Sequence, residues 1–168
     1  TDWKTTPPEI LWKQKIGEGW SGFAAVNGFA LTQEQREQDE CVTCYDIATG
    51  ELIWMRKWNR RHEDTMAMGK VGPRATPTIH EGLVYVTGGT GVLHCLNGTD
   101  GETVWSVDVP SLVGISQHPL KTSRGLDYTM EDSTLMWGRS CSPLIYEDKV
   151  IVSAGGPAID PNNSTVTL

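Results

Sequence analysis

The chain is poor in positive charge and contains no long apolar run. Its 168 residues include 14 Lys and Arg against 21 Asp and Glu, which gives a formal net charge of −7. This balance disfavours a nucleic-acid partner, because phosphate backbones are bound by clustered positive charge. No stretch of 18 apolar residues exists, so the sequence offers no candidate membrane-spanning helix. The one basic cluster, at residues 56–61, lies beside Glu63 and Asp64, and we expect a solvated loop there.

The usual sequence signals of processing, catalysis and metal binding are also missing. The N-terminus lacks a charged segment followed by an apolar one, and it starts at Thr1, which suggests a processed or truncated chain. No Gly-x-Ser-x-Gly nucleophile elbow is present. The four histidines show no metal-ligand spacing: His62, His80, His94 and His118. We therefore expect neither a catalytic residue nor a metal site.

Two further motifs have simple structural interpretations. Residues 88–91 (GGTG) look like a phosphate loop, but no helix pattern follows them, so we expect a hairpin turn. Cys41-Val-Thr-Cys44 looks like a redox or zinc motif. Positions three apart on a strand point to opposite faces, and no second pair supplies the remaining ligands of a tetrahedral site. We expect the cysteines to be small buried residues, while the sequence leaves three disulfide pairings open.

What the chain does contain is an internal repeat. Residues 44–54 (CYDIATGELIW) recur without a gap at residues 95–105 (CLNGTDGETVW). Each copy predicts a β-hairpin whose second strand ends in Trp. Upstream, residues 75–89 match residues 141–155, and residues 23–32 form a fainter third copy with a turn at Asn27-Gly28. Asn-Gly between apolar runs is a strong hairpin signal, because both positions must accept a positive φ.

Four short antiparallel strands per unit, repeated along the chain, predict an all-β fold built of propeller blades. The sequence predicts one partial β-propeller over residues 1–168. Its expected parts are a closing strand at 9–16, blades at 20–58 and 72–109, and an incomplete blade at 138–168. Insertions are expected at about 55–71 and 110–137.

The motif apolar-Asp-x-x-Thr-Gly-x-x-x-Trp resembles the repeat of the pyrroloquinoline quinone (PQQ)-type propeller family. That family contains quinoprotein alcohol dehydrogenases and cofactor-free members, such as the lipoprotein of the outer-membrane barrel assembly machinery. The match is close at residues 45–54 and looser at 96–105, where Asn97 and Asp100 replace the motif's Asp and Thr. Many dehydrogenases of the family carry two adjacent cysteines near the quinone, whereas here Ser142 follows Cys141. The chain is thus closer to the cofactor-free members, which implies no cofactor and an extracytoplasmic location.

The resemblance also implies roles for individual residues. Trp54 and Trp105, and by analogy Trp12, are expected to dock their indoles between blades, against glycines such as Gly50 and Gly101. A second set lies where propeller loops approach the central channel, and we expect it to form a binding surface: Trp20, Arg74, Trp137 and Arg139.

Two functional hypotheses remain open from the sequence. The first is a non-catalytic binding or scaffold module, whose partner is a protein or the remaining blades of a longer chain. The second is a fragment of a dehydrogenase that uses PQQ and Ca²⁺, with Asp127, Glu131 and Asp132 as acidic candidates. Because a propeller has about 4–8 blades, the chain is expected to be part of a longer protein. The alternative is a homodimer that completes the ring.

Overall fold

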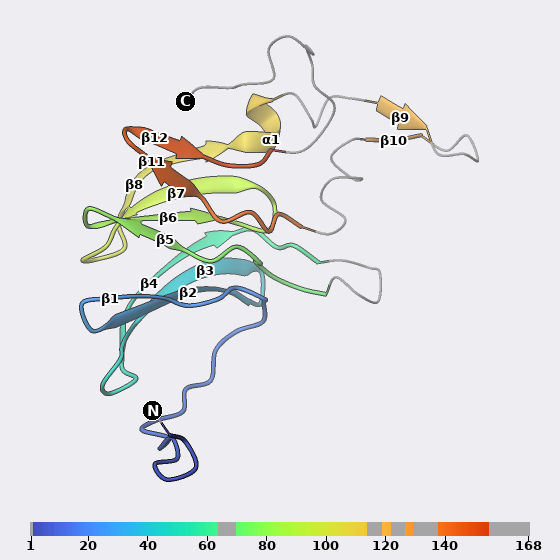
Figure 1. The fold of residues 1–168 in the computed structure, drawn as a ribbon. Coiled ribbons are helices and arrows are strands. Elements are labelled where there is room, and N and C mark those ends of the chain that lie inside the picture. The colour runs from blue at the N-terminus through green and yellow to red at the C-terminus, as the bar shows by residue number, and fades with distance from the viewer. Residues whose placement is uncertain (1, 64–69, 114–118, 122–126, 130–137, 155–168) are drawn as a thin grey trace.

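The computed structural model describes the whole chain except residues 1, 64–69, 114–118, 122–126, 130–137 and 155–168. The described part is almost entirely antiparallel β-structure (Figure 1). Its elements are β1 (Ala24–Val26), β2 (Phe29–Arg36), β3 (Asp39–Asp46), β4 (Leu52–Asn59), β5 (Thr78–His80), β6 (Leu83–Thr87), β7 (Val92–Asn97), β8 (Thr103–Asp108), α1 (Val109–Leu112), β9 (Pro119–Lys121), β10 (Asp127–Thr129), β11 (Leu144–Tyr146) and β12 (Lys149–Ile151).

The repeat folds into sheets in which neighbouring strands are also neighbours in sequence. The first blade has the order β1-β2-β3-β4 and the second has the order β5-β6-β7-β8. The hairpin β11-β12 begins a third unit, and β9-β10 forms a separate hairpin within the second insertion. The fold is therefore a partial β-propeller of four-stranded antiparallel blades. Its ring is not closed in the described residues.

The inner hairpins form because their turn residues accept positive φ angles. Asn27 and Gly28 have φ of 49° and 85°, and Glu81 and Gly82 have φ of 48° and 79°. Two-residue turns of this kind match the right-handed twist of the strands that they join. The turn at 88–91 also joins two strands, β6 and β7, as the sequence predicted. Each blade then repeats a β-bulge, where the register shifts after Cys44 and after Cys95.

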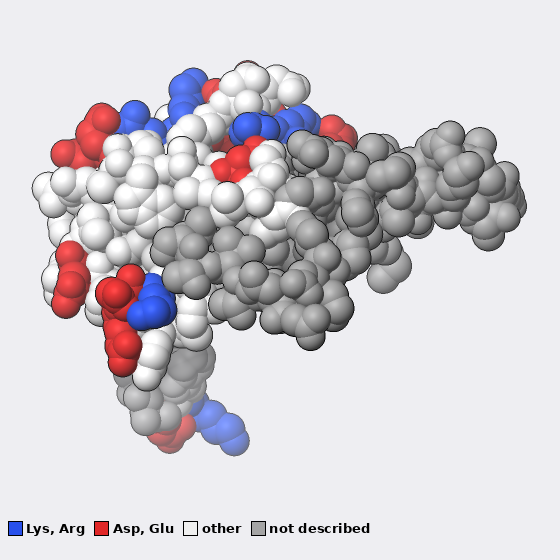
Figure 2. All heavy atoms as spheres, turned by 90° about the horizontal axis from the view of Figure 1, so that it is seen from above, with Lys and Arg blue, Asp and Glu red and all other residues white. Residues whose placement is uncertain are grey.

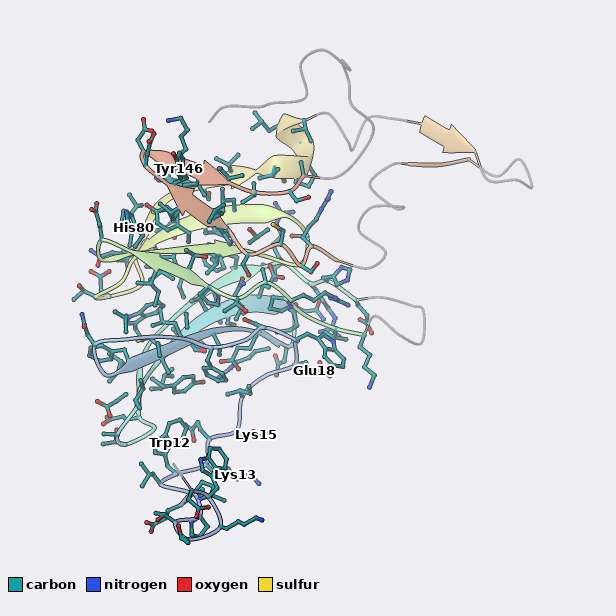
Figure 3. All side chains as sticks on the ribbon, viewed as in Figure 1. Trp12, Lys13, Lys15, Glu18, His80 and Tyr146 are labelled. Carbon is teal, nitrogen blue, oxygen red and sulfur yellow. The ribbon has the colours of Figure 1, made fainter. Side chains whose placement is uncertain are left out.

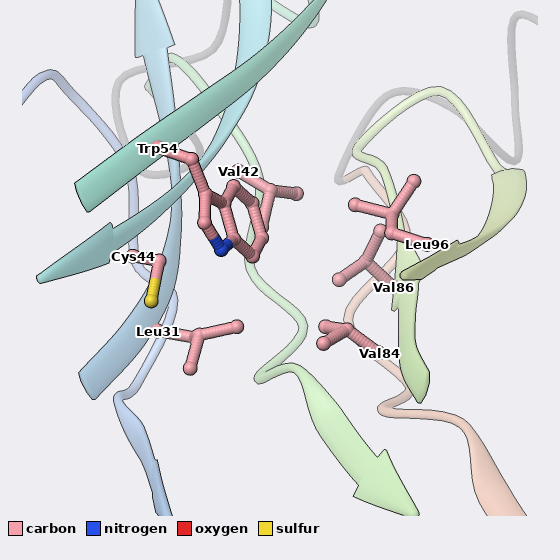
Figure 4. Close-up of a cluster of buried hydrophobic side chains, with 7 residues drawn as sticks. All are labelled: Leu31, Val42, Cys44, Trp54, Val84, Val86 and Leu96. Atoms are coloured by element: carbon pink, nitrogen blue, oxygen red, sulfur yellow. The ribbon is translucent and has the colours of Figure 1, made fainter. Parts of the chain in front are cut away.

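The two blades pack face to face around an apolar core. Leu31, Val42 and Trp54 of the first blade face Val84 and Leu96 of the second (Figure 4). The exposed fraction of Val42 and Leu96 is 0%. Cys41, Cys44 and Cys95 are buried free thiols, as expected from the sequence, whereas Cys141 is only partly buried. Burial raises the pKa of both Cys41 and Cys44 to about 11, so their reactive thiolate forms are disfavoured.

Two expected boundaries differ from the structure. The first concerns the basic cluster, which is not a loop at its start, because β4 continues to Asn59 and the first insertion begins at Arg60. Arg56 faces the second blade, where its Nε donates to the carbonyl of Gly101 and its guanidinium pairs with Glu102. This contact between blades could not be read from local composition.

The second difference concerns residues 9–16, which form no strand. A strand needs a hydrogen-bonding neighbour, and no strand of the described residues lies beside this segment. Figure 3 shows it descending from the first blade towards the N-terminus. Beyond it, Glu18 makes an isolated antiparallel bridge with Gln35. The helices of the described residues are too short to cross a membrane.

Candidate binding surface at the insertion end

The blades have two chemically different ends. We call the end with the hairpin turns at residues 27–28, 47–49, 81–82, 98–100 and 147–148 the turn end, on the left in Figure 1. The opposite end, which we call the insertion end, carries the turns at 37–38 and 88–91 and the starts of both insertions. The core is apolar towards the turn end, whereas polar and charged side chains are buried towards the insertion end.

Glu40, in the first blade, is a buried acidic residue of the insertion end. Its exposed fraction is 4%, and its Oε1 accepts the backbone N–H of Gly89 at 2.6 Å. Burial raises the pKa of Glu40 to about 6, although the N–H of Gly89 and the positive charge of Arg60 act in the opposite direction. A Cβ at Gly88 would lie 2.1 Å from Oε2, so only glycine lets the carboxylate approach this turn.

Three cationic or ionisable side chains surround the same turn. Gly138 fits between Arg74 and His62, since a Cβ there would lie 2.8 Å from Nη1 of Arg74 and 2.8 Å from Nε2 of His62. Arg139 donates its backbone N–H to the carbonyl of Gly89 at 2.9 Å, and burial lowers the pKa of its guanidinium. The cluster therefore joins the start of the third unit to the turn of the second blade.

Trp20 is the large exposed aromatic residue of this end. Its exposed fraction is 58%, while its backbone N–H donates to the carbonyl of Pro73 at 2.8 Å. The hydroxyl of its neighbour Ser21 accepts the backbone N–H of Gln33 at 3.2 Å. The indole is therefore exposed to solvent, while hydrogen bonds at Trp20 and Ser21 hold its chain segment in place. One of these bonds goes to Pro73, which precedes Arg74.

Of the four residues predicted for the channel surface, three lie in the described part of the chain. The backbone of Trp20 bonds to Pro73, the residue before Arg74, and a Cβ at Gly138, the residue before Arg139, would lie 2.8 Å from Nη1 of Arg74. Trp137 lies outside the described residues.

A second polar contact between blades was not predicted from the sequence. His94 of β7 stacks on Trp58 of β4 with ring centroids 3.8 Å apart and an interplanar angle of 18°. Burial lowers the pKa of His94 to about 4, and the charge of Arg60 adds to this effect. Arg60 itself lies 3.7 Å from the carboxylate of Asp108 on the second blade. A neutral imidazole is therefore packed as an aromatic ring.

The turn end shows how the recurring Trp residues are placed. The ring of Trp54 lies against Gly101 of the next blade, where a Cβ would meet it at 2.5 Å. Its indole N–H donates to the carbonyl of Gly98 at 3.1 Å. Gly101 has a φ of +73°, so this position needs glycine for its backbone and for its contact.

Trp12 makes the equivalent contact on the first blade, although its segment is not a strand. Its indole N–H donates to the carbonyl of Ile47 at 2.7 Å, and a Cβ at Gly50 would meet its ring at 2.6 Å. Ile47 and Gly98 occupy the same position of the repeat. Trp105 is partly buried and packs against Tyr85 with ring centroids 6.1 Å apart.

The comparisons with known proteins agree with the repeat. The family model described as "Outer membrane protein assembly factor BamB" matches residues 5–135 and 38–165. This chain belongs to that family. A BamB relative, the outer membrane protein assembly factor of Shewanella oneidensis, is 26% identical over 112 residues, which cover 61% of this chain and 27% of the relative. The chain thus spans about a quarter of the length of that relative.

Two solved structures also show partial similarity to this chain. The quinohemoprotein alcohol dehydrogenase from Comamonas testosteroni is 19% identical with a TM-score of 0.49, covering 82% of this chain and 17% of the enzyme. BamB from Moraxella catarrhalis is 13% identical with a TM-score of 0.33, covering 79% of this chain and 46% of that protein.

Within this BamB-family fold, the buried polar side chains of the insertion end hold backbone segments in place. Glu40 has the raised pKa that is common in catalytic acids and bases. It is, however, almost fully buried and hydrogen-bonded to the backbone, so a substrate cannot reach it. In the described part of the chain, no group of three or more His, Cys, Asp or Glu side chains could hold a metal ion. Glu40 and the backbone of Arg139 instead hold the turn at Gly89 in place, at the same end of the blades as the exposed indole of Trp20.

Proposed function

We propose that this chain is a non-catalytic binding module of a BamB-type propeller, which holds a protein partner at its insertion end. The observation that carries the proposal is the exposed indole of Trp20 on a rigid backbone beside Arg74. Trp and Arg dominate the binding energy of many protein interfaces, because they combine a large apolar area with directed hydrogen bonds. The family relative is an assembly factor by name, which supports a protein partner and a location in the cell envelope.

The buried cluster supports the same proposal. Glu40 and Arg139 tie the turn at 88–91 to the first blade and to the third unit. A surface that is already ordered loses less conformational entropy when a partner binds. The insertions start from this ordered base, and long loops on rigid scaffolds commonly carry binding functions.

Site-specific photo-crosslinking tests the proposal. A photoreactive phenylalanine analogue is introduced at Trp20 and, as a matched control, at Trp3, another exposed tryptophan with an exposed fraction of 67%. We expect a discrete protein adduct from position 20 in the native host, lost when Arg74→Ala is added, and none from position 3. Adducts that are absent, or equal at the two positions, would refute a partner surface at Trp20.

The dehydrogenase alternative is tested separately. Ca²⁺ prefers a cage of oxygen ligands, and the described residues supply no such acidic group. Of the acidic candidates, Glu131 and Asp132 lie outside the described residues, and the side chain of Asp127 is not described. Saturable quenching of tryptophan fluorescence by PQQ with Ca²⁺, at micromolar concentration, would favour the enzyme over the binding module.

A further inference from the structure

An apolar cavity lies at the turn end of the joint between the first two blades, opposite to the insertion end. Its volume is about 260 Å³. Its floor includes Leu31, Trp54 and Val84, and its rim includes Phe29 and Ile53. The rim residues are exposed to 38% and 47%, although they are large and apolar. Exposed apolar surface around a concave site marks interaction sites in soluble proteins.

The size of the cavity selects the kind of group that it can hold. An apolar cavity of about 150 Å³ can bind benzene, so this one accepts an aromatic ring or a large aliphatic side chain. Sites for drug-sized ligands are larger, at about 300–1,000 Å³. The cavity therefore fits a single anchoring side chain.

The charges around the cavity indicate which residues of a partner would flank the anchoring side chain. Glu81 and Asp100 directly adjoin the lining residues Gly82 and Thr99. No Lys or Arg of the described residues forms an ion pair with Glu81, whose carboxylate lies 3.9 Å from His80. Figure 2 shows both acidic and basic side chains on the left, the side of the hairpin turns. Arg56, whose Nε donates to the carbonyl of Gly101 beside the cavity, is already paired with Glu102. The turns that line the cavity thus carry two acidic side chains, Glu81 and Asp100, that have no Lys or Arg partner among the described residues.

We propose that this cavity is a docking site for a basic peptide segment of a partner protein, which inserts one large apolar side chain between the blades. The apolar anchor is desolvated on Trp54 and Ile53, while flanking Lys or Arg side chains face the acidic turns. The site uses no residue of the insertion end, so its test is independent of the function proposed above.

The repeat supplies a matched control for each half of the site. Ile53 lines the cavity, and its equivalent Val104 does not, although both stand at the bulge before a Trp and are exposed to 47% and 56%. Glu81 has the equivalent Glu147, which also has a positive φ but lies away from the cavity.

The probe is a fluorescein-labelled synthetic peptide with one Trp between two pairs of Lys, and binding is followed by anisotropy at low salt. We expect saturation with a Kd below about 1 mM. We expect Ile53→Ser to weaken binding about fivefold or more and Val104→Ser less than about twofold. Glu81→Gln should weaken binding about two- to threefold and lower its salt dependence, and Glu147→Gln should not. Circular dichroism verifies that the variants are folded.

Several outcomes would overturn the proposal. The first is equal binding of a peptide with Ala in place of Trp, and the second is equal binding of one with Glu in place of Lys. The third is an equal loss in the members of either variant pair, or an absence of saturation at 1 mM. Finally, if free indole bound as tightly as the peptide, the cavity would be a small-molecule site.

Discussion

Trp54→Ala is the substitution that tests most directly how the blades hold together. The Trp54 side chain is 9% exposed and touches both sheets, so the change removes an indole from the centre of the apolar core. A buried aromatic side chain covers about 150–250 Å², which is worth roughly 4–6 kcal/mol at about 25 cal/mol per Å². Partial relaxation of the cavity reduces this value, and we expect a loss of about 3–5 kcal/mol in the free energy of unfolding.

The assay is urea denaturation followed by far-UV circular dichroism, because the substitution removes part of the fluorescence signal. Trp54→Phe keeps most of the ring but loses the hydrogen bond to Gly98, so its cost should be about 1 kcal/mol plus a small packing loss. It also remains measurable if the alanine variant does not fold.

The N-terminal indole supplies the control. Trp12→Ala removes the same kind of hydrogen bond and glycine contact, but Trp12 is only partly buried and its segment is not part of a sheet. We expect a loss of about 1–2 kcal/mol. The reasoning would be refuted by a loss below about 1 kcal/mol for Trp54→Ala. It would also be refuted if the two alanine variants lost the same stability.

Two further predictions concern a glycine contact and a buried charge. In urea denaturation, Gly101→Ala should lower the free energy of unfolding more than Gly82→Ala. Both glycines have a positive φ, but only at Gly101 would the new Cβ meet a Trp ring. Equal losses in the two variants would argue against that contact. Glu40 has a folded pKa of about 6 against 4.5 unfolded, so folding takes up a proton between these two values. Glu40 therefore makes the free energy of unfolding fall by about 2 kcal/mol in total as pH rises from well below 4.5 to well above 6. Glu40→Gln should remove this fall. If the difference in the free energy of unfolding between variant and wild type did not change with pH, the raised pKa of Glu40 would be contradicted.

Much of the fold could be predicted because each repeat contains the same turn and strand signals. The turn at Asn27-Gly28 and its equivalents specify hairpins through residues that accept positive φ. The alternating apolar positions between them place the core on the face that meets the next blade. The expected strand at residues 9–16 was wrong, because a strand forms only beside a partner strand, and the local sequence does not show whether a partner is present.

The candidate site was predictable only in part. Arg74 and Arg139 were selected by their equivalent places before the inner strands, and the structure places the Arg74 guanidinium against Gly138, the residue before Arg139. Glu40 and His94 were missed, because a single charged or polar residue on a strand does not reveal what it will face. The pair Gly88-Gly89 was a usable signal, since two small residues leave room for a side chain from another blade.

The sequence by itself determined the unit of construction: four antiparallel strands, their turns, and a Trp in the outer strand of each complete blade. The expected end of that strand at the Trp was wrong, since β4 continues to Asn59 and β8 to Asp108. These features depend on neighbours within a few residues, so local chemistry is enough to specify them. Only the tertiary structure decided which charges are buried between blades and where a cavity remains. Those outcomes depend on residues about 50 positions apart meeting across an interface, such as the Glu40 carboxylate and the backbone N–H of Gly89. Their energies arise from burial, which no single segment has until the blades pack together.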